Sequence, residues 1–209
     1  TGTLTKTGPG WFLFRGSAPA NFQGSIVING GRLGNGFNTT VWTNSTTDVF
    51  VAAGAELDLR VDDMILDELT GSGTVINTYS VGGSDTLSIG SNNGSSQFDS
   101  VIRGIGGVGA NDTSIDVGRN NLTKIGTGTF TLTGASVYGG NTTVNNGVLR
   151  IGGSNDRLPI ATPLIVNGGA SVGGTFDLNS LNQTVGTLSG GSGVVSGIVT
   201  NLATGTGTL

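Results

Sequence analysis

The sequence predicts an all-β fold, a β-solenoid whose coils take roughly 20 residues each. Glycine accounts for 40 of the 209 residues and proline for only 4. Short runs that alternate apolar and polar residues are separated by turns such as Asn146-Gly147, a pattern typical of strands and tight turns. The same layout recurs along the chain. Stacked coils explain that recurrence, because they bury their apolar sides only against one another.

The clearest repeat covers residues 4–34 and 122–153. Each copy opens with Leu-Thr-Lys and continues with glycines at matching positions, Gly8 and Gly10 in the first copy and Gly126 and Gly128 in the second. The first copy is two residues longer around Ala18-Pro19-Ala20. Both copies predict two short strands separated by glycine turns.

A second set of matching stretches follows each copy. Leu57-Asp58-Leu59 corresponds to Phe176-Asp177-Leu178, and residues 69–75 correspond to residues 188–195. We therefore divide the chain into two long units, residues 1–121 and residues 122–209, of one continuous solenoid. Since Thr1 lies inside a repeat, we expect the chain to be a segment of a longer protein.

Two alternatives to this fold arise from the sequence. Asn-Gly between alternating strands also favours an antiparallel meander, but a meander does not require corner glycines in register along two units. Residues 59–69 place apolar side chains at helical spacing, with acids opposite. Their counterpart, residues 178–188, lacks that pattern and contains a glycine. We interpret both segments as strand and turn.

Composition limits the function. The net charge is −4 with a pI near 4.5, so neither nucleic acid nor insertion of this segment into a membrane is expected. The chain contains no cysteine and no histidine, and it shows no phosphate-binding motif. Residues 106–111 approach a calcium-binding repeat but have Asn111 in place of the carboxylate. We therefore predict no cofactor, no metal site and no catalytic residue.

Residues 122–134, together with the segments 138–144 and 147–150, closely resemble the autotransporter-associated β-strand repeat, also called the passenger-associated transport repeat. This resemblance implies a right-handed parallel β-helix within a bacterial surface or secreted protein. The family supplies no catalytic or binding residue that can be transferred to this chain. The first copy departs from the pattern, because it has Trp11, Leu13 and Arg15 where the second copy has threonines.

These three residues form the candidate binding site. Phe12 and Phe14 alternate with them, so the phenylalanines should point inward while Trp11, Leu13 and Arg15 point outward. An exposed tryptophan and leucine beside an arginine could contact a sugar ring or a partner protein. The alternative is that the Ala18-Pro19-Ala20 insertion, or a preceding coil, covers them.

The other candidate is an acidic run from Glu56 to Glu68, which holds 6 of the 13 acids. Paired carboxylates could hydrolyse glycosides, but Asp177, the counterpart of Asp58, lacks acidic neighbours. A solvated acidic face is the favoured interpretation.

The sequence thus predicts a non-enzymatic, extracellular structural segment, a stiff stalk or fibre module at a bacterial surface. Its expected partners are itself or adjacent repeats, end to end. The alternative is an adhesive module that binds glycan or a partner protein on a neighbouring cell surface through an exposed sheet face.

Overall fold

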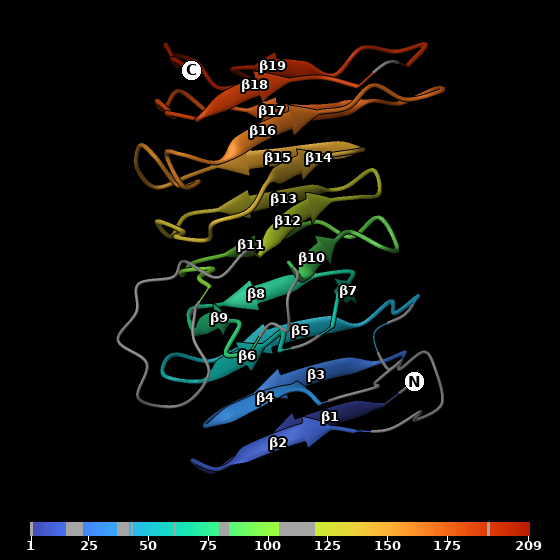
Figure 1. Cartoon of the computed structure of the whole chain (residues 1–209), viewed down its shortest axis with the longest axis vertical. Coiled ribbons are helices and arrows are strands. Elements are labelled where there is room, and N and C mark those ends of the chain that lie inside the picture. Colours follow the sequence, from blue (N-terminus) through green and yellow to red (C-terminus); the bar gives the residue numbers. More distant parts are fainter. Residues whose placement is uncertain are drawn as a thin grey trace.

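The computed structural model describes residues 2–15, 23–36, 42, 44–60, 62–79, 84–104, 120–191 and 193–209. Within these ranges the chain forms strands and turns, with no helix. The coils stack along one axis, with β1 and β2 at one end and β18 and β19 at the other (Figure 1). All neighbouring strands in the described sheets are parallel, which confirms the parallel β-helix and excludes the meander.

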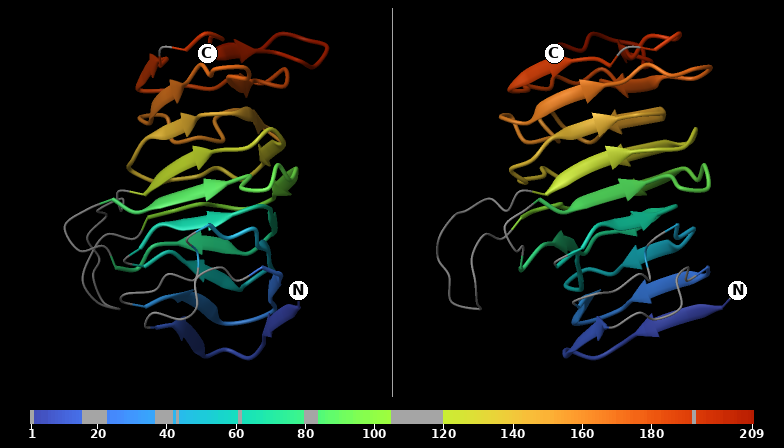
Figure 2. Two further views of the ribbon diagram at one scale, coloured as in Figure 1. Left: turned by 90° about the vertical axis from the view of Figure 1, so that its right-hand side faces the viewer. Right: turned by 45° about the vertical axis from the view of Figure 1, so that its right-hand side comes forward.

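Three sheets, named sheets A, B and C, run along the sides of the stack in the part of the chain that the structure describes (Figure 2). Sheet A contains, in spatial order, β1 (Thr3–Lys6), β3 (Ser25–Ile28), β5 (Asp48–Val51), β8 (Leu69–Gly71), β11 (Ser96–Phe98), β13 (Thr129–Leu132), β15 (Gly147–Ile151), β17 (Gly174–Asp177) and β19 (Ile198–Thr200). Sheet B contains β2 (Trp11–Phe14), β4 (Arg32–Asn35), β6 (Glu56–Asp58) and β9 (Thr74–Ile76). Sheet C contains β18 (Thr187–Ser189), β16 (Pro163–Val166), β14 (Thr142–Val144), β12 (Asn121–Lys124), β10 (Thr86–Ile89) and β7 (Met64–Leu66).

The coils vary in length. The shortest step between paired positions of sheet A is 19 residues, from Thr129 to Val148, and the longest is 34 residues, from Ser96 to Phe130. Strands remain three to five residues long throughout, so the additional residues lie in the connections. The predicted coil of roughly 20 residues is therefore the minimum needed to pass once around the shaft.

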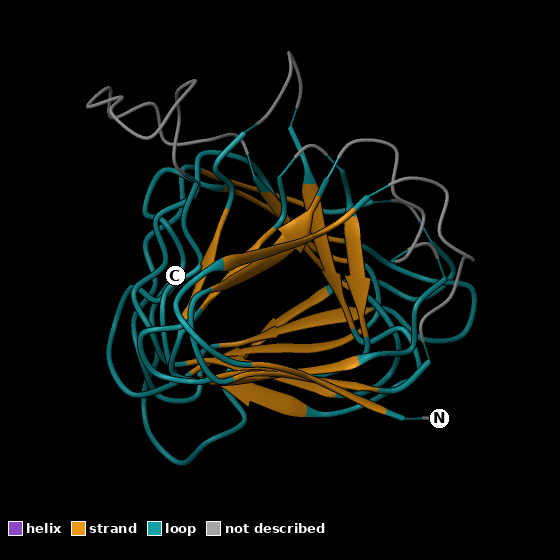
Figure 3. Cartoon of the chain, turned by 90° about the horizontal axis from the view of Figure 1, so that it is seen from below, coloured by secondary structure: helices purple, strands orange, loops and turns teal. Residues whose placement is uncertain are grey.

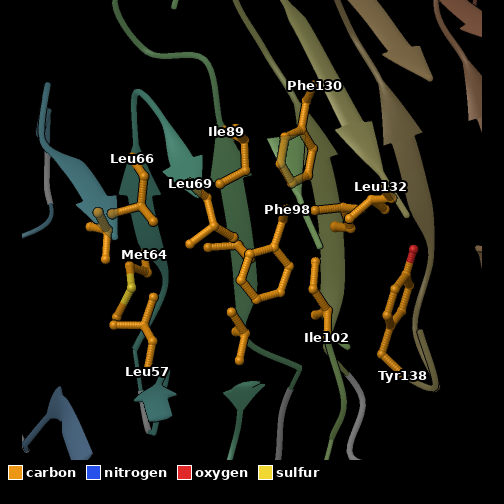
Figure 4. Packing of buried hydrophobic residues seen from close by; sticks show 14 of the residues in the cluster. Leu57, Met64, Leu66, Leu69, Ile89, Phe98, Ile102, Phe130, Leu132 and Tyr138 are labelled. Atoms are coloured by element: carbon orange, nitrogen blue, oxygen red, sulfur yellow. The ribbon is translucent and has the colours of Figure 1, made fainter. Parts of the chain in front are cut away.

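The shaft is filled by alternate residues of each strand, because side chains along a strand point to opposite faces. In β13, Phe130 and Leu132 are buried, while Thr129 and Thr131, which alternate with them, lie half-exposed on the outer face. Viewed along the axis, the strands enclose this core and the connections lie outside it (Figure 3). Figure 4 shows the packing at mid-stack, where Phe98 lies between Leu69 and Ile102. Each such side chain contributes roughly 1.5–3 kcal/mol by its burial.

The segment with helical spacing forms two strands instead. Met64 and Leu66 of β7 point into the core and Ile65 points out, a period of two rather than 3.6. Arg60 adopts a positive φ of 34°, which turns the chain between β6 and β7. The interpretation as strand and turn is confirmed.

The repeat copies lie on different faces of the rod. The Leu-Thr-Lys strand is β1 of sheet A in the first copy and β12 of sheet C in the second. The strand after it is β2 of sheet B in the first copy and β13 of sheet A in the second. The change occurs at β7, β8 and β9, where consecutive strands enter sheets C, A and B. Equivalent residues of the two copies are therefore not aligned along one side.

Candidate functional site

The predicted binding residues lie on the outer face of sheet B. Trp11 is 58% exposed, Arg15 is exposed and Leu13 is half-buried. Trp11 is aligned with Arg32 on the adjacent strand, and the Arg32 guanidinium carbon lies 4.2 Å from the centroid of the indole ring. The structure thus combines the predicted tryptophan with an arginine from the next coil.

Arg32 is held by acids on the following coil. Its Nη2 atom lies 2.7 Å from Oε2 of Glu56, and its Nη1 atom lies 3.6 Å from Oδ2 of Asp58. Arg103 approaches the other Glu56 oxygen at 3.9 Å. Trp11, Arg32 and Glu56 therefore form a connected row across β2, β4 and β6, which we call the Trp11 row.

Arg32 was not among the predicted site residues, although the sequence carries a signal for it, and Glu56 was predicted only as a member of the acidic run. Trp11 and Arg32 each directly follow a corner glycine, Gly10 and Gly31. Aligning those glycines places the two side chains on adjacent strands. Glu56 is harder to align because it lies two residues after Gly54.

Phe12 only partly matches the prediction that its side chain points inward. It is aligned with the buried Leu33 on the core side, but its side chain is 43% exposed. The reason is its position in β2, the edge strand of sheet B, where only one neighbouring strand covers it. Phe14 packs edge-to-face against the buried Trp42, with ring centroids 5.7 Å apart. The insertion Ala18-Pro19-Ala20 lies outside the described residues.

The acidic run does not form a solvated face, so that interpretation is wrong for two of its members. Asp58 is fully buried and accepts hydrogen bonds from the backbone N–H and hydroxyl of Thr78. Asp67 is nearly buried, and its Oδ1 atom accepts two backbone N–H groups at 2.8 and 2.9 Å. Asp63 accepts the backbone N–H of Thr86 at 2.7 Å. These carboxylates stabilise turns between coils.

A shallow hollow of about 430 Å³ lies between the connections 135–139 and 156–162. Its wall includes the exposed Val137 and Ile160 and the buried Tyr138, whose hydroxyl is 2.6 Å from that of Thr142. Burial raises the Tyr138 pKa. The Asp156 carboxylate accepts the backbone N–H of Thr184. The lining therefore holds no pair of groups arranged for acid–base chemistry.

Within the described ranges, no three acidic side chains are grouped as metal ligands, and no helix is long and apolar enough to cross a membrane. The degenerate calcium motif at residues 106–111 lies outside those ranges.

Comparison with known proteins supports the resemblance noted in the sequence. Residues 4–34 and 122–151 match the family model described as the passenger-associated-transport-repeat. The adhesin BmaC autotransporter of Brucella suis biovar 1 (strain 1330) is 32% identical over 208 residues, which cover 94% of this chain and 6% of that protein. No solved structure matches the chain significantly. The chain thus carries two such repeats and spans only a small part of the length of this relative.

Proposed function

We propose that the chain is a non-enzymatic, extracellular rod segment of a bacterial autotransporter passenger, which holds other parts of that passenger away from the cell. The continuous sheet A carries this proposal: it joins β1 to β19 by parallel backbone ladders without interruption. A ladder of this kind resists bending and stretching, because extension requires breaking rows of hydrogen bonds together. The passenger repeats and the autotransporter relative support the extracellular setting.

The rod proposal includes association end to end, with another copy or with adjacent repeats. In the 209-residue chain, β1 and β19 are the edge strands of sheet A. Edge strands offer unpaired backbone groups to another strand. Negative-stain microscopy should show fibres that lengthen with protein concentration. Particles of constant size across a hundredfold range of concentration would contradict end-to-end association.

The enzymatic alternative has a direct test. Purified chain should release no reducing sugar from a panel of bacterial and host polysaccharides. Hydrolysis that disappears in Asp62→Asn or Asp63→Asn would contradict the non-enzymatic role.

The Trp11 row favours a second function, adhesion to glycan. An exposed indole offers an apolar surface for a sugar ring, and the exposed Arg15 supplies hydrogen-bond donors on the same outer face, whereas Arg32 is engaged by Glu56. The relative named an adhesin supports an adhesive role. On a glycan array, binding should be lost in Trp11→Ala and retained in Ile160→Ala, which removes an exposed apolar side chain elsewhere. Equal binding by both variants, or no binding by the unsubstituted chain, would contradict adhesion through this row.

A further inference from the structure

The two repeat copies share a lysine that points into the core. Lys6 and Lys124 are the last residues of β1 and β12. Each occupies an inward position in a row of aliphatic side chains: Lys6 is aligned with Ile28, and Lys124 lies between Ile89 and Val144. The Lys124 side chain is fully buried, although an aliphatic residue would match its neighbours better.

The ammonium group of each lysine binds the turn that follows its own strand. The Nζ atom of Lys124 donates to the carbonyl oxygens of Ile125 and Gly126, at 2.5 and 3.0 Å. Lys6 makes the corresponding bonds to its next two residues, at 2.9 and 2.8 Å. The second residue in each turn is a glycine with positive φ, 63° at Gly126 and 75° at Gly8. The lysine therefore closes the same left-handed corner in both copies.

The corner geometry is maintained although its surroundings change. The first corner leads from sheet A to sheet B, and the second leads from sheet C to sheet A. Lys6 also reaches the corresponding turn of the next coil, where it donates to the carbonyl oxygen of Gly30 at 2.9 Å, and it remains half-buried. The feature common to both sites is therefore local: the lysine, the two carbonyl groups and the glycine.

Burying a charged lysine in this position is energetically unfavourable. Burial lowers the pKa of Lys124 to about 8, although the charge of Asp67 acts in the opposite direction. A buried group that is harder to protonate than in water must be compensated by the bonds it makes. Those bonds go to the two corner carbonyl oxygens, which belong to the half-buried residues Ile125 and Gly126.

We propose that the motif lysine is a positioning residue that sets the corner of each repeat. Its inward ammonium group fixes where the strand ends and the glycine turn begins, whichever face of the rod the strand occupies. The repeat thus encodes one corner of a coil rather than one face of the solenoid. This role is independent of whether the rod acts as a spacer or as an adhesin.

The absence of cysteine from the chain permits a test that changes only the terminal group of the side chain. Lys124→Cys is alkylated in denaturant and then refolded. Reaction with 2-bromoethylamine joins the thiol sulfur to an aminoethyl group with loss of bromide, giving a side chain as long as lysine that ends in an ammonium. Reaction with 1-bromopropane gives a side chain of the same length that ends in a methyl group.

Hydrogen exchange at the amides of Ile125, Thr127 and Asn145, which bond across coils at this corner, provides the readout. The aminoethyl form should show the exchange rates of the unsubstituted chain. The propyl form should exchange about tenfold faster at these three amides, as expected for loss of a charged hydrogen bond, or should fail to refold. Amides of β19 serve as the internal control.

Two results would overturn the proposal. Equal protection of the three amides in the two alkylated forms would show that the length of the buried side chain, and not its ammonium group, maintains the corner. Failure of the aminoethyl form to regain protection at the corner would show that restoring the ammonium does not restore the turn. Thr123→Met, on the outer side of the same strand, should leave all three amides unchanged.

Discussion

At the scale of single residues, Asp177 is a buried carboxylate stabilised in its charged form. Burial alone would raise its pKa, but the N–H groups of Leu202 and Asn179 and the Arg150 guanidinium, 2.7 Å away, together hold the pKa below its usual range. Its contribution to stability is therefore present above the unfolded-state pKa and is lost as pH falls. We expect Asp177→Asn to lower the free energy of unfolding at pH 7 by about 2 kcal/mol, with a smaller loss at pH 3. Urea denaturation of both proteins between pH 3 and pH 7 measures this difference in the free energy of unfolding.

Asp58, at the equivalent position of the first unit, should behave in the opposite way. Burial raises its pKa, and the bonds from Thr78 and the charge of Arg32 only partly offset this. The stability that this group contributes is thus present at low pH and is lost as pH rises through its folded-state pKa. Relative to the unsubstituted chain, Asp58→Asn should become less stable as pH falls, whereas Asp177→Asn should become more stable. If the stability of both variants relative to the unsubstituted chain changed with pH in the same direction, the opposite pKa shifts of Asp58 and Asp177 would be contradicted.

Lys124 gives a third dependence on pH. Its pKa is about 8 in the folded chain, against an ordinary 10.5. Between these values the unfolded chain binds more protons, so the free energy of unfolding should rise with pH over this interval. Lys124→Met removes the group and should remove that part of the rise. An identical pH profile above pH 8 in both proteins would contradict the burial of this ammonium.

At the scale of elements, the corners depend on glycine for two separable reasons. Gly147 has a φ of 63°, and a side chain there would lie 2.4 Å from the carbonyl oxygen of Gly126, which belongs to the adjacent coil. Gly54 has a φ of 79° but open space around it. We expect Gly54→Ala to cost about 1–2 kcal/mol from backbone conformation alone. Gly147→Ala should cost roughly 3 kcal/mol or more, because the adjacent backbone must also move.

Thermal unfolding of the two glycine variants, under identical conditions, makes the comparison. If Gly147→Ala lost no more stability than Gly54→Ala, close stacking of the coils at this corner would be contradicted.

Elements were predictable from sequence where the signal was local. Alternation identified β13, and the recurring glycines identified the corners, since both follow from the pleat of a strand and from φ alone. The face on which each strand lies was not predictable. It depends on how far the chain travels around the shaft between β6 and β10, and sequence similarity between the copies carries no information about that rotation.

In the candidate site, too, local features could be predicted from the sequence and contacts between coils could not. The outward direction of Trp11 came from alternation within one strand. Its contact with Arg32 required the alignment of two coils. The burial of Asp58 could not be read from the acidic run, because it depends on hydrogen bonds from Thr78, a residue one coil later.

At the scale of the whole molecule, the coils are stacked in parallel along one axis. Distances along sheet A therefore increase in regular steps, because each strand adds one inter-strand spacing of about 4.8 Å. Thr5, Thr131 and Thr200 all point outward from this sheet, from β1, β13 and β19. In the order of the sheet, β13 is five strands beyond β1, and β19 is three strands beyond β13.

Electron paramagnetic resonance between pairs of spin labels tests this arrangement most directly, since cysteines introduced at these threonines would be the chain's only thiols. A parallel stack predicts separations of about 24 Å for Thr5 and Thr131, and about 38 Å for Thr5 and Thr200, each broadened by the label arms. A Thr5 to Thr200 separation equal to or shorter than that of Thr5 to Thr131 would contradict a parallel stack.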